Sequence, residues 1–222
     1  MVTHSVPRRS FLSRLAAAGA AFAAGSAMPR SLAAAPMDPA KPDELESWFL
    51  AMKGPNKAIY DCTSAGAAPN GVFFARNLIK FSAEKLGTKD ADMSVVVCFR
   101  HFGTPFGYND AMWAKYPQLA EMLQVDDPAT KKRATRNWML HELVEGEAEA
   151  NLPGIRGHGA SIAVCGAATS FLAGVLAGQT GNAKAIEADL AANLVPGGRI
   201  VAAGVVAVQR AQKAGFAYTY AG

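Results

Sequence analysis

Residues 159–168 read GASIAVCGAA, and this stretch decides the fold. Its apolar part, residues 160–164, is short, contains two β-branched residues and leads to Cys165, which is the pattern of a buried strand. Gly166 and an Ala-rich segment follow at once, as at the start of a helix. A strand that runs into a helix is the repeating unit of a parallel α/β sheet.

Two earlier segments repeat this pattern. Residues 58–60 and 93–97 are apolar runs that lead to Cys62 and Cys98, and each is followed by a loop and then a helical pattern. The carboxyl ends of parallel strands meet at one edge of the sheet, where such folds bind ligands, so we expect the three cysteines to share one rim. Cys98 lies among apolar residues, which favours a buried hydrophobic role. Cys165 directly precedes an expected helix, which favours a functional site there.

Strand and helix patterns alternate along the chain. The expected strands are residues 57–61, 92–99, 160–165, 199–202 and 216–220. The expected helices are residues 43–52, 72–86, 108–116, 117–123, 138–147, 169–177, 183–194 and 205–214, with loops at 62–71, 100–107 and 152–159. The alternation predicts an α/β fold, a single-domain three-layer sandwich with a mostly parallel five-stranded sheet and helices on both faces.

Residues 117–152 depart from this simple alternation. A polar loop with a turn signal joins the two helical patterns in this region, which indicates an insertion or a lid. Its four glutamates are most simply a solvated helix face: Glu142, Glu145, Glu147 and Glu149.

The first 35 residues predict an export signal. They carry four arginines and no acidic residue, then an apolar stretch that is too short for a stable membrane anchor, and then small residues before Pro36. Residues 5–12, SVPRRSFL, resemble the twin-arginine signal, in which an arginine pair precedes a polar residue, Phe and Leu. A basic arm that binds nucleic acid or lipid would not need the Ala-rich stretch.

We therefore expect three parts: a twin-arginine (Tat) signal peptide over 1–35, a leader and helix over 36–56, and the α/β domain over 57–222. The Tat translocase would export the folded protein to the periplasm, and the signal would be removed. Four of the 22 Lys and Arg residues lie in the signal, so 18 remain against 18 Asp and Glu and the mature chain is formally neutral. A neutral chain lacks the excess of positive charge that is typical of proteins that bind nucleic acids.

Several classes of site lack their motifs. No Gly-rich phosphate loop follows a strand, and neither the serine-hydrolase elbow nor Cys-x-x-Cys occurs. The histidines have no metal-ligand spacing, so no metal site and no cofactor is predicted. Three cysteines in an exported chain leave it open whether one pair oxidises or all three stay reduced.

The carboxyl-terminal part carries a resemblance to a known family. Residues 159–168 are followed by LVPGG (194–198), VAAGVV (201–206), Gln209 and GFAY (215–218). This series resembles the DsrE/DsrF-like sulfur-relay superfamily, which has a strand ending in Cys, a later Pro-Gly turn, a Gly-Val helix entry and a closing aromatic strand. The match runs from Lys57 to Tyr220 and is firmest from Gly159.

The resemblance implies an α/β protein that forms homo-oligomers, trimers or hexamers, and carries a persulfide on the cysteine of the third core strand. That cysteine is Cys165 by motif position, whereas Cys62 and Cys98 have no counterpart. The implied partners are small sulfur species or a sulfur-carrier protein. Characterised members work in the cytoplasm and have shorter segments where this chain has residues 100–152.

The expected chemistry centres on Cys165. A thiol transfers sulfur only as the thiolate, and the unpaired amides of a helix N-terminus favour that form. Gly166 would let a substrate sulfur approach the backbone, and Arg100 would stabilise an anionic sulfur species. His101 would shuttle a proton or, equally well, be a loop histidine bound to a carbonyl.

The cysteines at 62 and 98 leave further alternatives open. They would contact the substrate or take part in a relay from Cys165, or they would be structural. The alternative function is a non-enzymatic oligomeric protein of the same fold that binds a small ligand, a metal or haem at this rim.

Overall fold

In the described part of the chain, the sheet has five strands, all parallel, in the order β4-β3-β2-β1-β5. The computed structural model describes residues 44–142, 144–178 and 181–222, so the expected signal peptide lies outside the described residues. The strands are β1 (Asn56–Cys62), β2 (Met93–Phe99), β3 (Ser161–Cys165), β4 (Gly198–Val201) and β5 (Ala217–Tyr220). The expected α/β fold is confirmed, and the sheet is parallel throughout.

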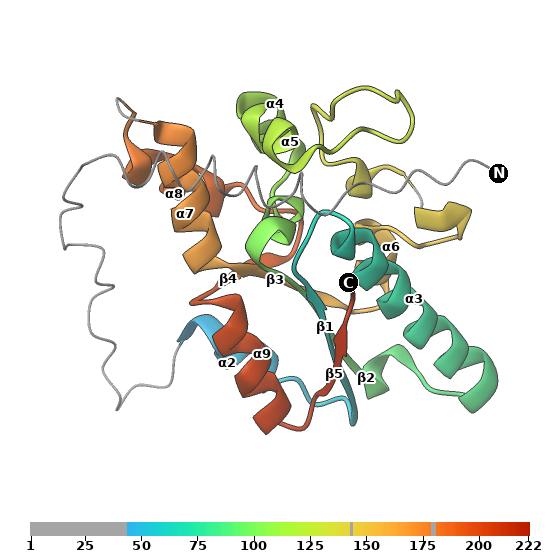
Figure 1. Ribbon diagram of the computed structural model, residues 1–222. Coiled ribbons are helices and arrows are strands. Elements are labelled where there is room, and N and C mark those ends of the chain that lie inside the picture. Colours follow the sequence, from blue (N-terminus) through green and yellow to red (C-terminus); the bar gives the residue numbers. More distant parts are fainter. Residues whose placement is uncertain (1–43, 143, 179–180) are drawn as a thin grey trace, which may run out of the picture. The chain divides into compact units, whose positions relative to one another are not determined.

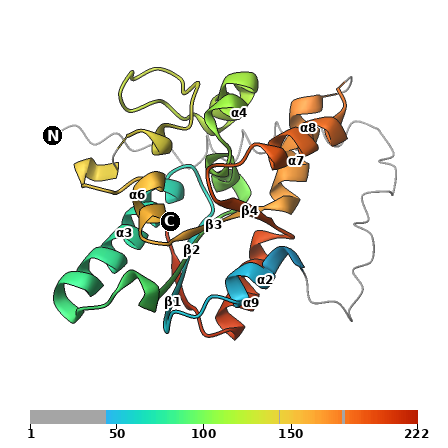
Figure 2. The same ribbon diagram turned by 180° about the vertical axis from the view of Figure 1, so that it is seen from behind.

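Helices cover both faces of the sheet (Figure 1). On one face, which we call the α3 face, α3 (Ala67–Leu86) packs on β1 and β2 over a core that includes Tyr60, Val97 and Val164. On the opposite α9 face, α2 (Glu44–Leu50) and α9 (Gly204–Lys213) cover a smaller core around Ile59, Val96 and Ala163. Figure 2 shows the same two layers from behind.

The remaining helices lie in the connections before and after β3. They are η2 (His101–Gly107), α4 (Asp110–Lys115), α5 (Gln118–Leu123), η3 (Trp138–Leu140), η4 (Val144–Gly146), α6 (Leu152–Gly157), α7 (Gly166–Ala177) and α8 (Ala183–Ala192), and a 3₁₀ turn η1 (Asp90–Asp92) precedes β2. Within the described residues, no helix combines the length and apolar character that a membrane span requires.

All three expected loops are partly helical, and the loop expected over 100–107 is the 3₁₀ helix η2. Helix α3 begins at Ala67 rather than at residue 72, because the Ser64 hydroxyl accepts a hydrogen bond from the Ala67 amide and starts the helix earlier. Residues 152–157 form α6, whose first turn is capped by the Asn151 side chain. The helix expected over 138–147 is wrong, since two short 3₁₀ turns, η3 and η4, replace it.

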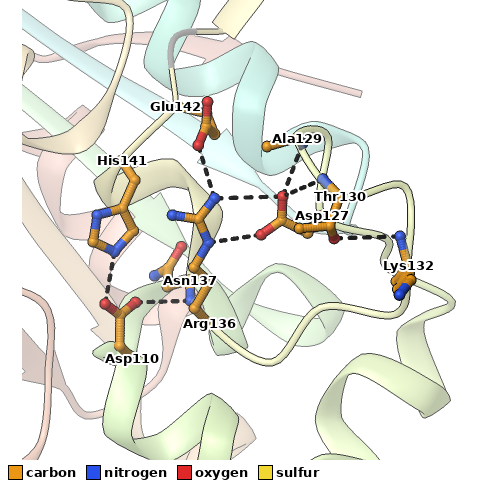
Figure 3. A network of polar contacts seen from close by, with 9 residues as sticks. All are labelled: Asp110, Asp127, Ala129, Thr130, Lys132, Arg136, Asn137, His141 and Glu142. Carbon is orange, nitrogen blue, oxygen red and sulfur yellow. Dashed lines mark hydrogen bonds and ion pairs between the residues drawn. The ribbon is translucent and has the colours of Figure 1, made fainter.

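Arg136 organises the segment over residues 117–152 (Figure 3). Its guanidinium binds Asp127 at 2.7 Å and Glu142 at 2.7 Å, and the Asp127 carboxylate also accepts the amides of Ala129 and Thr130. Asn137 joins the segment to η2. Its side-chain amide donates to the backbone carbonyl of Phe106 in η2 and to that of Tyr108, which directly follows η2.

The glutamates expected on a solvated helix face do not share a helix, and three of them form ion pairs, although Glu147 and Glu149 stay exposed to solvent. Glu142 binds Arg136, Glu147 binds the nearly buried Arg76 at 2.9 Å, and Glu149 lies 3.2 Å from His158. These carboxylates join the segment to itself, to α3 and to the end of α6.

Candidate functional site at the carboxyl ends of the strands

Cys165 lies between the starts of two helices. It ends β3 and is the N-cap residue of α7, where its Sγ accepts a hydrogen bond from the Ala168 amide at 3.3 Å. The Gly204 amide, at the first turn of α9, donates to the same sulfur at 3.1 Å. Cys165 is buried with 6% of the residue exposed, whereas Cys62 and Cys98 are fully buried.

The pairing of β3 with β4 creates this arrangement. Cys165 pairs with Val201, so the turn that leaves β4 towards α9 passes beside the sulfur. Each helix presents the partial positive charge of its first amides, and both charges therefore face the same sulfur atom. Two backbone N–H groups from different helices thus point at one sulfur atom.

Gly166 allows the backbone to pack closely at this point. A Cβ at residue 166 would lie 2.8 Å from the carbonyl oxygen of Val201. The Ala167 amide donates to the carbonyl of Ala202 at 3.1 Å, which ties α7 to the end of β4. The close approach that Gly166 permits is thus to protein backbone, and the expected approach of a substrate sulfur stays a prediction.

Arg100 follows β2 and is held by a buried carboxylate. Its Nε and Nη2 donate to the two oxygens of Asp61 at 2.6 and 2.8 Å, and Asp61 is 0% exposed. The Tyr218 hydroxyl of β5 donates to the same carboxylate at 2.9 Å. Hydrogen bonding to Asp61 raises the pKa of Arg100, and burial together with the Asp61 bond raises the pKa of Tyr218.

The stem of Arg100 lies on the first residue of α9. A Cβ built on Gly204 would come within 2.4 Å of the Arg100 Cβ, so only glycine fits between this side chain and the sheet edge. Arg100 therefore touches the residue whose amide binds Cys165. Its charge is already compensated by Asp61, so it is not an unengaged cation for an anionic ligand.

His101 is exposed and begins the 3₁₀ helix η2. Its backbone is in the left-handed region, with φ of 53°, and its ring packs edge-on against Phe102 with the centroids 4.2 Å apart. Within the described part of the chain no hydrogen bond joins this ring to Cys165. The proton-shuttling role of His101 stays a prediction.

The structure separates the other two thiols from Cys165. Cys62 points to the α3 face, where a Cβ on Gly71 would lie 2.2 Å from its Sγ, and burial raises its thiol pKa well above the usual value. Cys98 belongs to the core of the α9 face and pairs with Ala163, two residues before Cys165. Strand spacing then places the Cα atoms of Cys98 and Cys165 about 8 Å apart, beyond disulfide reach.

The three cysteines consequently lie at successive levels near the carboxyl edge of the sheet and do not meet at one site. All of them lie in the described residues and none is in a disulfide. A sulfur relay between Cys165 and Cys62 would have to cross the sheet.

Sequence reasoning missed Asp61, Tyr218 and Gly204. Asp61 carried a signal, because a carboxylate at the end of an apolar strand needs a buried partner and Arg100 ends the next strand. The motif that contains Gly204 predicts the start of a helix and does not indicate a contact with Cys165. Nothing in the sequence showed that Tyr218 would reach Asp61 across the pairing of β1 with β5.

A separate cavity of about 240 Å³ lies on the α3 face, away from Cys165. Its lining includes the apolar residues Ile79, Ala83 and Ile155 and the charged groups of Asp90, Glu149 and His158. These residues come from the middle and end of α3, the turn before β2 and helix α6 with its flanks, which places the cavity towards the amino ends of the strands.

Among the described residues, no group of three or more His, Cys, Asp and Glu side chains is arranged to hold a metal ion. In comparisons with known proteins, no family model, no curated protein and no solved structure matches this chain. The resemblance to the DsrE/DsrF-like superfamily stays a prediction from the motifs.

Proposed function

We propose that this protein carries sulfane sulfur as a persulfide on Cys165. The observation that supports the proposal is the pair of amide hydrogen bonds, from Ala168 and Gly204, that meet at the Cys165 sulfur. Sulfur transfer requires a thiolate that attacks and later leaves, and both steps gain from groups that stabilise negative charge on sulfur.

The transfer is an exchange without net oxidation. The Cys165 thiolate attacks the outer sulfur of a donor persulfide, the S–S bond of the donor breaks, and the donor leaves as a thiolate. The proton of the outer sulfur moves with it, so Cys165 becomes Cys–S–SH. An acceptor thiolate then attacks this outer sulfur and Cys165 leaves as a thiolate, which the two amides stabilise.

The charge balance and the low exposure of the site both bear on the kind of sulfur donor that it would accept. The Arg100 charge is balanced by Asp61, so the anion on Cys165 is stabilised by backbone amides. Only 6% of the Cys165 residue is exposed, which favours a donor with a thin, extended persulfide group over a bulky one. The resemblance to sulfur-relay proteins points to the same chemistry and to a trimer or hexamer, which sedimentation analysis of the mature protein would test.

Intact-mass analysis after exposure to glutathione persulfide tests the proposal. We expect a gain of one sulfur atom on Cys165, removed by a thiol acceptor. The matched control is Cys165→Ser, because a serine hydroxyl accepts the same cap bond and keeps the start of α7 intact. No gain in the folded wild type, or an equal gain in Cys165→Ser, would refute it.

We infer that the protein acts in the periplasm after export by the twin-arginine pathway. The inference is supported by the sequence of residues 1–35 alone. Replacement of Arg8 and Arg9 by lysine should leave the full-length precursor in the cytoplasm, while the wild type is found in the periplasm in its shortened form. Export of the double-lysine variant at the wild-type level would contradict the inference.

The second candidate function is binding of a small ligand in the 240 Å³ cavity, without sulfur chemistry. Its apolar residues and its charges of both signs suit a small amphipathic molecule. An NMR screen of such compounds would be read on the methyl groups of Ile79 and Ile155. Binding at these methyls in a protein that takes up no sulfur would favour this candidate.

A further inference from the structure

Four neighbouring strands each bring one polar side chain to the α9 face at the carboxyl edge of the sheet. In spatial order these are Tyr218 of β5, Asp61 of β1, Arg100 at the end of β2 and Cys165 of β3. The first three are joined by hydrogen bonds of 2.6 to 2.9 Å. The row ends at the sulfur that we propose carries the persulfide.

Asp61 is the buried centre of this row. Its carboxylate is 0% exposed, and both oxygens are occupied, one by Arg100 Nε and the other by Arg100 Nη2 and the Tyr218 hydroxyl. A buried ion pair is weak support for stability, because desolvation of its charges offsets their attraction. What it does fix is the direction of the Arg100 side chain, since a bidentate pair has one planar geometry.

Arg100 transmits this geometry to Cys165 through Gly204. Its Cβ, Cγ and Cδ atoms all lie within 3.1 Å of where a Cβ on Gly204 would stand. The Gly204 amide points at the Cys165 sulfur at 3.1 Å. A displacement of the Arg100 stem would therefore displace the start of α9 and lengthen this hydrogen bond.

We propose that Asp61 is a positioning residue for Cys165, which through Arg100 holds the Gly204 amide against the sulfur. The assignment of Cys165 as the sulfur-bearing group rests on the proposed function, whereas the positioning itself concerns only the charge state and reactivity of the thiol. Tyr218 of the edge strand β5 adds to this positioning, because its hydroxyl donates to the second carboxylate oxygen of Asp61.

The test is the pH profile of Cys165 alkylation by iodoacetamide in the folded protein. In Asp61→Glu the negative charge that compensates Arg100 is kept, but the longer side chain displaces the guanidinium and its stem. The thiolate then loses part of its stabilisation, so the midpoint of the profile should rise by about one pH unit, which is about a tenfold slower reaction below the midpoint. The matched control is Asp127→Glu, which makes the same change in another nearly buried Asp–Arg pair far along the chain. Equal midpoints in Asp61→Glu and wild type would overturn the proposal, as would an equal rise in Asp127→Glu.

Milder variants cover the case in which Asp61→Glu does not fold. Tyr218→Phe removes a single hydrogen bond and should move the midpoint in the same direction by less. Gly204→Ala forces a Cβ against Arg100 and should raise the midpoint, whereas Gly174→Ala should not, because a Cβ there meets nothing within 4 Å. Unchanged midpoints in both Tyr218→Phe and Gly204→Ala would refute the positioning role.

Sulfur uptake from glutathione persulfide by the wild type is measured in parallel. Shifted midpoints in a protein that takes up no sulfur would leave the positioning intact and refute the persulfide function. Sulfur uptake by the wild type with unshifted midpoints in the variants would support the persulfide function and refute the positioning role of Asp61.

Discussion

The backbone amide of Gly204 donates to the sulfur of Cys165 over 3.1 Å, although 39 positions separate the two residues. The contact exists because β4 lies beside β3 and its chain turns into α9 at the height of the cysteine. Because the amide of Ala168 in α7 donates to the same sulfur, amides from the first turns of two helices meet at one atom.

Selective alkylation is the first consequence. Iodoacetamide should label the native protein once per chain, at Cys165, because this residue retains 6% exposure while Cys62 and Cys98 have none. Labelling of the other two should require unfolding. Peptide mapping after a timed reaction checks this order, and a Cys165 thiol that stays inert in the intact protein would also count against the persulfide function.

The second prediction concerns the packing of α3 on β1. In Gly71→Ala the new Cβ would lie 2.2 Å from Cys62 Sγ, so the helix or the strand must shift, at a cost of about 1–3 kcal/mol in the free energy of unfolding. Cys62→Ala removes that sulfur, and the double variant Cys62→Ala/Gly71→Ala should recover most of the loss caused by Gly71→Ala. Denaturant unfolding of the four proteins measures the coupling, and strictly additive losses would show that the close contact is not the cause.

The sequence allowed the sheet to be predicted and the site only in part. Short apolar runs that end at Cys62, Cys98 and Cys165 located three strands correctly, because a buried parallel strand has a strong local pattern. Side chains alternate between the two faces along a strand, so a shift of one residue at the strand end changes the face that a thiol takes. Cys62 consequently lies on the opposite face from Cys165. The partners Asp61, Tyr218 and Gly204 come from strand order and crossover, which no local pattern encodes.

The segment over residues 117–152 illustrates the same limit. Its polar composition favoured a solvated helix, but Arg136 brings Asp127 and Glu142 together across a loop (Figure 3). Long-range ion pairs of this kind leave no periodic trace in a sequence.

The third prediction follows from the Asp127 carboxylate. The bond from Arg136 lowers its pKa below the ordinary value, so its stabilisation of the folded state is present at neutral pH and lost as the pH falls below about 4. Asp127→Asn should therefore reduce the free energy of unfolding by about 1–3 kcal/mol at neutral pH, since the carboxylate is nearly buried and accepts two backbone amides as well. Unfolding curves at neutral and acidic pH measure the difference, which should shrink towards acid; a difference that grows towards acid would contradict it.

The last prediction concerns His158 at the edge of the cavity on the α3 face. Hydrogen bonds to Asp90 at 3.0 Å and to Glu149 at 3.2 Å raise its pKa, and Arg76, Lys80 and Glu84 are the other charged groups that line the cavity. A raised folded-state pKa means that the stabilisation is complete below about pH 6.5 and disappears as the pH rises through the raised value. Because the groups are about one-third to two-thirds exposed, the effect is at most about 1 kcal/mol and falls with added salt.

The measurement is the difference in free energy of unfolding between wild type and His158→Gln as a function of pH. The wild type should be the more stable protein in mild acid, and the difference should vanish in mild alkali. The same substitution in an Asp90→Asn/Glu149→Gln background is the control, in which the pH-dependent part should be absent because no carboxylate remains to favour the imidazolium. A difference that persists in alkali, or that survives in the control background, would show that His158 acts by packing rather than by charge.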